Sequence, residues 1–149
     1  MKTIQMEAIL ATHFNYVQNI IVPNVQWGMG VHECDLFILR PSGYAVEVEI
    51  KVSKSDLIKD KEKWHEHRSY KIKELWFAIP EKLEPYIEHI PERAGIAIVR
   101  PYPNGWGRVE RVRQPTKNKN AHKHTEKEAA KLARLGSMRI WGLKRKLAV

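Results

Sequence analysis

The chain has 149 residues, of which 43% are hydrophobic, and these figures are typical of one globular domain with its own core. Its single cysteine, Cys34, excludes an internal disulfide and fits a reducing cytoplasm, where we expect the protein to reside. No apolar run approaches the roughly 20 residues of a membrane span, and Gln5 and Glu7 interrupt the first segment, so neither a membrane span nor a signal peptide is expected.

The net charge of +9 is unevenly distributed along the chain. Residues 1–115 carry 16 Lys and Arg against 15 Asp and Glu, whereas residues 116–149 carry 10 against 2. We therefore expect a nearly neutral domain over residues 1–115, followed by a basic linker and helical tail over residues 116–149. Such a tail favours a polyanionic partner, most simply nucleic acid, although a solubilising tail is the alternative.

The first predicted element is an amphipathic helix over residues 3–21, because apolar residues recur there at helical spacing. Pro23 and Asn24 are expected to end this helix. A short strand is predicted around residues 25–27, ahead of a glycine-containing segment. The chain would thus begin with one long helix.

Two strands are predicted next, over residues 31–39 and 44–52, joined by the turn sequence RPSG. The polar stretch over residues 53–69 predicts a second helix, with Leu57, Ile58 and Trp64 at inward positions. Residues 74–79 predict a buried strand, and a short helix is expected around residues 81–89. This order of elements is that of a mixed α/β domain.

The last part of the domain predicts a hairpin whose arms are residues 95–100 and 105–113, because Asn104 and Gly105 form a typical turn between them. A polar linker over residues 114–124 is expected to follow. Thr125 and Glu128 then have the spacing of a capping box, so a basic C-terminal helix is predicted, with a break at Gly136-Ser137.

The charged residues of the first hairpin form the most informative pattern in the sequence. If residues 41–43 are a three-residue loop, Asp35 lies opposite Glu49 and Glu33 lies opposite Lys51, all on one face. Opposite side chains in a sheet have their Cβ atoms about 4.5–5.5 Å apart. A slip of one residue would instead put Asp35 and Glu49 on opposite faces.

Two carboxylates at this distance repel each other by roughly 1–4 kcal/mol, so stability alone would not place them together. A divalent cation such as Mg²⁺ or Mn²⁺ would remove the repulsion, because it binds hard oxygen ligands. The alternative is a solvent-facing strand with alternating charges. Glu33 and Glu47 are open in either role, as further ligands or as surface acids.

Asp35, separated by thirteen residues from Glu49-Ile50-Lys51, resembles the D…(D/E)-x-K signature of the PD-(D/E)XK nuclease superfamily. The stretch over residues 48–80 resembles the MmcB-like DNA-repair group, which runs as E-(V/I)-K-S-S, D-F-x-x-D-x-K-W, a Tyr-containing segment and F-F-A-V-P. The residues that fill similar places, with the tryptophan one position later, are Asp56, Asp60, Trp64, Tyr70 and residues 76–80. The resemblance covers roughly residues 30–100, and the tail has no counterpart in it.

The resemblance implies a restriction-endonuclease-like αβββαβ core with a mixed sheet, plus the basic C-terminal helix. It also implies that Asp35 and Glu49 bind Mg²⁺ or Mn²⁺ together with the main-chain carbonyl of Ile50. Lys51 would orient or deprotonate the attacking water, and Glu7 matches a helical glutamate that touches the site in many members.

Five basic residues are expected to contact the phosphate backbone of DNA, two of them in the C-terminal helix, although a solvated helix face is the alternative. They are Lys54, Lys61, Arg68, Lys131 and Arg134.

The sequence therefore predicts a Mg²⁺-dependent DNA endonuclease or phosphodiesterase acting in DNA repair, recombination or phage DNA processing. The alternative is a non-catalytic nucleic-acid-binding protein on the same scaffold. A junction resolvase is a third possibility. Such enzymes act as homodimers, and the sequence contains no dimer signature, so a homodimer stays open.

Overall fold

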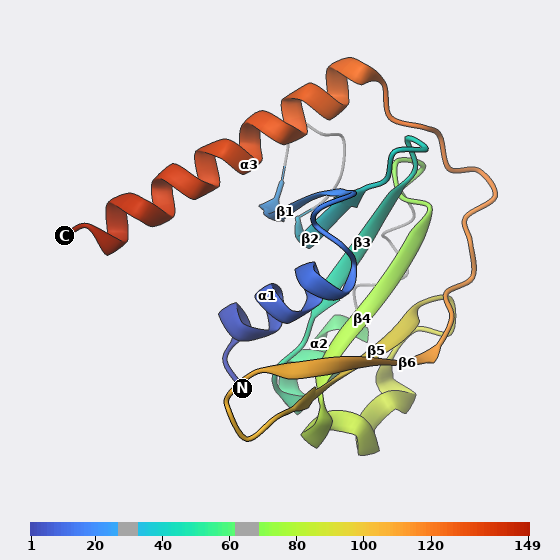
Figure 1. Ribbon diagram of the computed structural model, residues 1–149. Coiled ribbons are helices and arrows are strands. Elements are labelled where there is room, and N and C mark those ends of the chain that lie inside the picture. Colours follow the sequence, from blue (N-terminus) through green and yellow to red (C-terminus); the bar gives the residue numbers. More distant parts are fainter. Residues whose placement is uncertain (27–32, 62–68) are drawn as a thin grey trace.

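The computed structural model describes residues 1–26, 33–61 and 69–149, with the backbone alone at residues 60 and 61 (Figure 1). Its elements are α1 (Thr3–His13), β1 (Ile20–Val25), β2 (Cys34–Leu39), β3 (Ala45–Ile50), α2 (Lys54–Lys61), β4 (Glu74–Pro80), the 3-10 helix η2 (Glu81–His89), β5 (Gly95–Pro101), β6 (Gly107–Arg113) and α3 (Glu126–Leu147). In this described part the sheet has six strands in sequence order, and only β3, β4 and β5 run parallel. The expected mixed α/β fold with a C-terminal helix is confirmed.

The N-terminal helix is shorter than the apolar spacing predicts. It ends at His13, and Asn15 then adopts a left-handed conformation with φ of 66°, which turns the chain. The apolar residues from Ile20 onward belong to β1, an edge strand that tolerates Pro23 because its outer side needs no donor. The prediction of one helix over residues 3–21 was therefore wrong, and Val17 is 83% exposed.

Both faces of the sheet are covered, as Figure 1 shows for α1 on one side. Ile9 and Leu10 of α1 pack against apolar side chains from β2 to β5. On the opposite face, Leu57 of α2 and Leu83 of η2 pack over β4 and β5. Leu132 of α3 fills the space over β1 and β2. Burial of each such side chain contributes about 1.5–3 kcal/mol, so these contacts fix the strands of the hairpin in place.

The β2–β3 hairpin has the predicted register. The Arg40 amide donates to the Tyr44 carbonyl (3.0 Å), and the Gly43 amide donates to the Arg40 carbonyl (2.9 Å). Gly43 has a φ of 92°, which L side chains rarely adopt, so this loop requires glycine. Phe37 pairs with Glu47, as expected for a three-residue loop. The turn therefore determines which side chains face each other along both strands.

Helix α2 starts where the polar segment predicts it. The hydroxyl of Ser53 accepts a hydrogen bond from the Asp56 amide (3.2 Å), which caps the first turn. Leu57 is fully buried as expected, whereas Ile58 is 38% exposed, contrary to its predicted inward position. The rest of the predicted helix, residues 62–68, lies outside the described residues.

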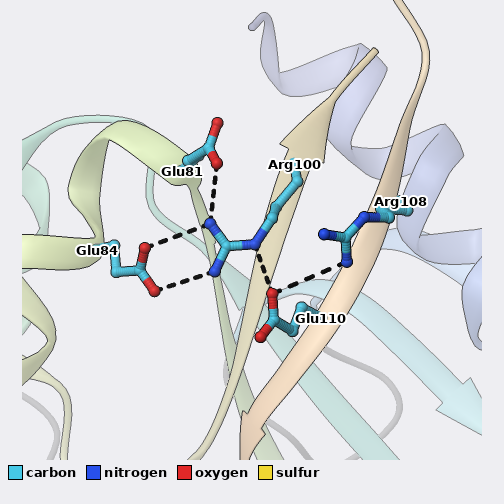
Figure 2. Close-up of polar contacts among 5 residues, drawn as sticks. All are labelled: Glu81, Glu84, Arg100, Arg108 and Glu110. Atoms are coloured by element: carbon cyan, nitrogen blue, oxygen red, sulfur yellow. Dashed lines mark hydrogen bonds and ion pairs between the residues drawn. The ribbon is translucent and has the colours of Figure 1, made fainter.

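An ion-pair cluster joins η2 to the closing hairpin of β5 and β6 (Figure 2). The guanidinium of Arg100 binds Glu81 at 2.9 Å and Glu84 at 3.1 Å on η2, and Glu110 at 2.5 Å on β6. Figure 2 also shows Arg108 beside Glu110, at 3.8 Å. Because three carboxylates from two elements converge on one guanidinium, the cluster holds η2 against the edge of the sheet.

The segment between β6 and α3 packs along the domain. The Thr116 amide donates to the Arg93 carbonyl (2.9 Å), and the His122 amide donates to the Tyr70 carbonyl (2.7 Å). The His124 ring is buried, lies edge-on to Phe37 and is 2.8 Å from the Lys71 carbonyl oxygen. His124 is therefore a packed side chain between the hairpin and the tail.

The C-terminal helix begins with the predicted capping box between Thr125 and Glu128. Leu132 is fully buried, and Gly136 lets the helix approach β1, because a Cβ there would lie 3.2 Å from Val22. The helix continues through Gly136, so the predicted break is absent. Its last turns extend beyond the sheet (Figure 1) and expose Leu143. No helix among the described residues is long and apolar enough to cross a bilayer.

Replacement of Leu132 by alanine tests whether the tail helix is part of the folded unit. We expect Leu132→Ala to lower the free energy of unfolding by about 2–5 kcal/mol, because it leaves a cavity between α3 and β1. Leu143→Ala is the matched control on the exposed part of the same helix, with an expected effect within about 0.5 kcal/mol. Urea unfolding measures both, and equal effects would contradict this packing.

The pair between Glu128 and Lys71 gives a pH-dependent prediction. The Lys71 ammonium, 2.7 Å away, lowers the pKa of Glu128 to about 2. A carboxyl with a lowered folded-state pKa stabilises the fold above pH about 4.5, and this stabilisation is lost as the pH falls towards 2.

Glu128→Gln retains the capping box but removes the charge. We expect it to cost about 0.5 kcal/mol at pH 7, since solvent screens the pair, and nothing at pH 2. Glu126→Gln, in the same turn, is the control. Urea unfolding across this pH range measures the difference, and a pH-independent effect of Glu128→Gln would contradict the assignment.

Candidate functional site

The hairpin brings Asp35 to the end of β3. Oδ2 of Asp35 accepts a hydrogen bond of 2.7 Å from the Ile50 amide. The observed register, continued by one pair beyond Leu36 and Val48, sets Asp35 opposite Glu49. In an extended strand the N–H and C=O of one residue point to the same side, so the Ile50 carbonyl also points towards β2. The predicted pair of acids and the predicted carbonyl thus meet at one place.

Glu49 and Lys51 lie side by side at this place, each with a side chain that is 15% exposed. Nζ of Lys51 is 3.8 Å from Oε2 of Glu49. The other carboxylate oxygen, Oε1, is buried and has no hydrogen-bond partner. A buried oxygen without a partner is costly, and a hard cation is one of the groups that would satisfy it.

The acids of the site resist ionisation. Burial raises the pKa of Glu49 strongly, and the neighbouring Glu47 and Asp35 raise it further, against the weaker effect of the Lys51 charge. Burial also raises the pKa of Asp35, although the Ile50 amide and Lys51 oppose it. Carboxyl groups that are this unfavourable as anions fit a site completed by a divalent cation.

Glu47 is a third carboxyl in the interior, only 2% exposed, and it adjoins Glu49 on the same face of β3. Burial, followed by the negative charges of Glu47 and Glu49, raises the pKa of the neighbouring Cys34 thiol. A thiol held protonated in this way is a poor nucleophile. Because Glu47 adjoins Glu49 in the interior, we count it among the acids of the candidate site. Glu33, in contrast, is exposed ahead of β2.

Glu7, the predicted helical glutamate of the site, lies on α1. Glu7 is half-buried on α1, and burial and then the charge of Asp35 raise its pKa. The side chain is thus within electrostatic reach of the acids on the hairpin. Among the described residues, no three His, Cys, Asp or Glu side chains form a group that could hold a metal ion. The predicted metal ligands differ from such a group, because they are the carboxylates of Asp35 and Glu49 together with the main-chain carbonyl of Ile50.

The described side chains among the basic residues predicted to contact DNA lie on two different helices, α2 and α3. Lys54 is exposed on α2, with its ammonium 4.5 Å from the centre of the Tyr86 ring. Lys131 and Arg134 are exposed on α3. The side chain of Lys61 and the whole of Arg68 lie outside the described residues. Their role in binding nucleic acid stays a prediction.

A second group of basic residues, which was not predicted from the sequence as a group, lines a cavity beside Glu47. It consists of Lys73, Arg93, Lys117 and Lys119. In the sequence, the only sign of this group was that Lys117 and Lys119 alternate with polar residues in the linker. The pairing with Arg93 was not visible, because it depends on how the segment lies along the sheet.

The chain belongs to the MmcB-like family, described as DNA repair protein MmcB-like, because the family model matches residues 5–146. The match includes most of the basic tail, so the expectation that the tail has no counterpart was wrong. The family points to a role in DNA repair.

The fold resembles that of a solved structure, the SPO1766 protein of unknown function from Silicibacter pomeroyi. The two share 17% sequence identity with a TM-score of 0.62, and the alignment covers 94% of this chain and 86% of the other. This likeness supports the fold alone. Among curated proteins, none has a sequence that matches this chain.

Calorimetric titration with Mn²⁺ tests the cation site. We expect the wild-type protein to bind Mn²⁺, and Asp35→Asn and Glu49→Gln each to weaken binding by at least about tenfold, because each removes a charged ligand. Glu88→Gln, which changes an exposed acid on η2, is the control. Equal binding by all four proteins would contradict a site at the hairpin.

Proposed function

We propose that this protein is a metal-dependent nuclease of the PD-(D/E)XK type that hydrolyses phosphodiester bonds in DNA. The observation that carries the proposal is the meeting of Asp35 and Glu49 on one face of the hairpin, with Lys51 alongside. The buried oxygen of Glu49 without a partner supports a cation there. The family's link to DNA repair supports DNA as the substrate.

Asp35, Glu49 and the Ile50 carbonyl would hold Mg²⁺ or Mn²⁺. When bound, the cation would supply Lewis-acid stabilisation of the reacting phosphate and a stronger nucleophile near neutral pH. The chain's own contribution begins with a fixed position for Asp35. Because the Ile50 amide already holds its carboxylate at 2.7 Å, Asp35 needs little reorganisation when substrate binds.

Lys51 would act directly on the substrate. Its ammonium lies 3.8 Å from Glu49 and is largely shielded from solvent, so bulk water screens its charge less than that of a surface lysine. There it would orient the attacking water and offset the negative charge that develops on the phosphate. Glu7, from α1, would receive a hydrogen bond from that water or from a neighbouring one.

A cleavage assay tests the proposal. Supercoiled, single-stranded and branched DNA are incubated with the protein in Mg²⁺ or Mn²⁺, and products are resolved on gels. We expect cutting of at least one substrate, and a loss of about 100-fold or more in Asp35→Asn and Lys51→Ala. Lys82→Ala, an exposed lysine on η2, is the control.

Two outcomes would contradict the proposal. Cutting that survives in both site variants would place the chemistry elsewhere or in a contaminant. Retention of DNA by the protein, with no cleavage of any substrate in either metal, would favour a nucleic-acid-binding protein on the same scaffold. Binding is therefore measured in parallel, by the mobility shift of each DNA in EDTA.

A further inference from the structure

A polar cavity of about 220 Å³ opens beside the acids of the hairpin. Four segments line it: β3 through Glu47, the entry to β4, the turn before β5, and residues 116–120 of the segment that leads to α3. Four of its lining residues are basic, and one is acidic. The basic residues are Lys73, Arg93, Lys117 and Lys119, and the acidic residue is Glu47.

Hydrogen bonds hold the outer wall of this basic cavity in place. The Asn118 amide donates to the Lys73 carbonyl (2.9 Å), and its side chain donates to the Ser69 carbonyl (3.2 Å). The Thr116 amide donates to the Arg93 carbonyl (2.9 Å). The cavity is therefore a formed feature of the fold, whose shape does not depend on the conformation of a loose linker.

The charges of the basic cavity favour an anion. Lys117 and Lys119 are exposed, and Arg93 is half-buried. The Lys73 ammonium lies 4.8 Å from the centre of the Tyr44 ring. The rest of the lining combines asparagine, serine and threonine residues with the apolar residues Ile72 and Leu75. Cations combined with neutral donors in a concave site are the usual surroundings of a phosphate group.

The position of the basic cavity relates it to the hairpin. Glu47 lines the cavity, and Glu49 follows two residues later on the same face of β3. Two residues along a strand span about 6.6 Å, which is comparable with the spacing of neighbouring phosphates along a nucleic-acid strand. A strand whose scissile phosphate lies at Asp35 and Glu49 can thus place a nearby phosphate in the cavity.

We infer that the basic cavity binds a backbone phosphate of the nucleic-acid strand next to the bond to be cut. This inference rests on the proposed function for its substrate. It assigns positioning of the strand to Arg93, Lys117 and Lys119, which the sequence analysis did not select. The phosphate contact fixes the register of the strand over the acids and carries no base specificity.

The test is equilibrium binding of a fluorescein-labelled single strand of about 12 nucleotides, a length within the usual range of single-strand sites. It is measured in EDTA over a range of salt concentrations. We expect the double variant Lys117→Ala/Lys119→Ala to bind about tenfold more weakly at low salt. Its slope of log Kd against log salt should be smaller by about 1–2, because each lysine that contacts phosphate contributes about one unit to the slope.

The matched control is Lys2→Ala/Lys82→Ala, which removes the same charge from two exposed positions away from the cavity. It should bind like the wild type. The melting temperature of each variant verifies that it is folded, which is expected because all four side chains are exposed. Equal weakening by the cavity pair and the control pair would overturn the inference, since it would show an effect of net charge alone.

Competition separates a strand phosphate from other phosphates. An unlabelled strand should displace the labelled one, whereas a 5′-mononucleotide or inorganic phosphate should compete at least about 100-fold more weakly, because neither makes further contacts along the backbone. A mononucleotide that competes as well as the strand would overturn the assignment in favour of a nucleotide site.

Because this assay needs neither metal nor cleavage, its failure differs from failure of the proposed function. If the cavity variants weaken binding but the protein does not cut DNA, only the proposed nuclease activity is contradicted. If the protein cuts DNA but the double variant Lys117→Ala/Lys119→Ala binds like the wild type, only the proposed phosphate site in the cavity is contradicted.

Discussion

The antiparallel register of β2 and β3 is the constraint on which the candidate site depends. Gly43, with its positive φ, closes a three-residue loop, and from there each pairing follows at fixed spacing. Asp35 and Glu49 therefore share a face, and the Ile50 amide holds the first of these acids. A register slipped by one residue would send one carboxylate into the apolar cluster beneath α1.

A second constraint is the cost of assembling acids in the interior. Asp35, Glu47 and Glu49 lie together, and burial and the neighbouring carboxylates disfavour the ionised forms of Asp35 and Glu49. Lys51 offsets part of this charge from a position 3.8 Å from Glu49. The body of the domain compensates through packing on both faces of the sheet, which holds the strands against this local repulsion. Such a local cost is typical of functional sites, where chemistry takes precedence over stability.

The basic tail has a structural role as well as a charge. Lys71 pairs with Glu128 and Leu132 fills the space above β1, so the start of α3 is held against the sheet. The segment that leads to α3 forms one wall of the basic cavity, through Asn118 and its contacts with the entry to β4. Part of the positive charge in the last part of the chain, that of Lys117 and Lys119, is thus brought next to Glu47.

The sequence by itself determined the elements whose signals are local. The turn at Gly43, the capping box at Thr125 and the alternation of charges around Glu49 each depend on neighbours within a few residues, and the structure has all three. The tertiary structure decided what depends on distant partners. The first helix ends at His13 because the following apolar residues are needed in an edge strand, although their spacing alone fits a helix. Likewise, the cavity beside Glu47 exists only because segments far apart in the chain lie together on the sheet, a proximity that no local pattern of residues encodes.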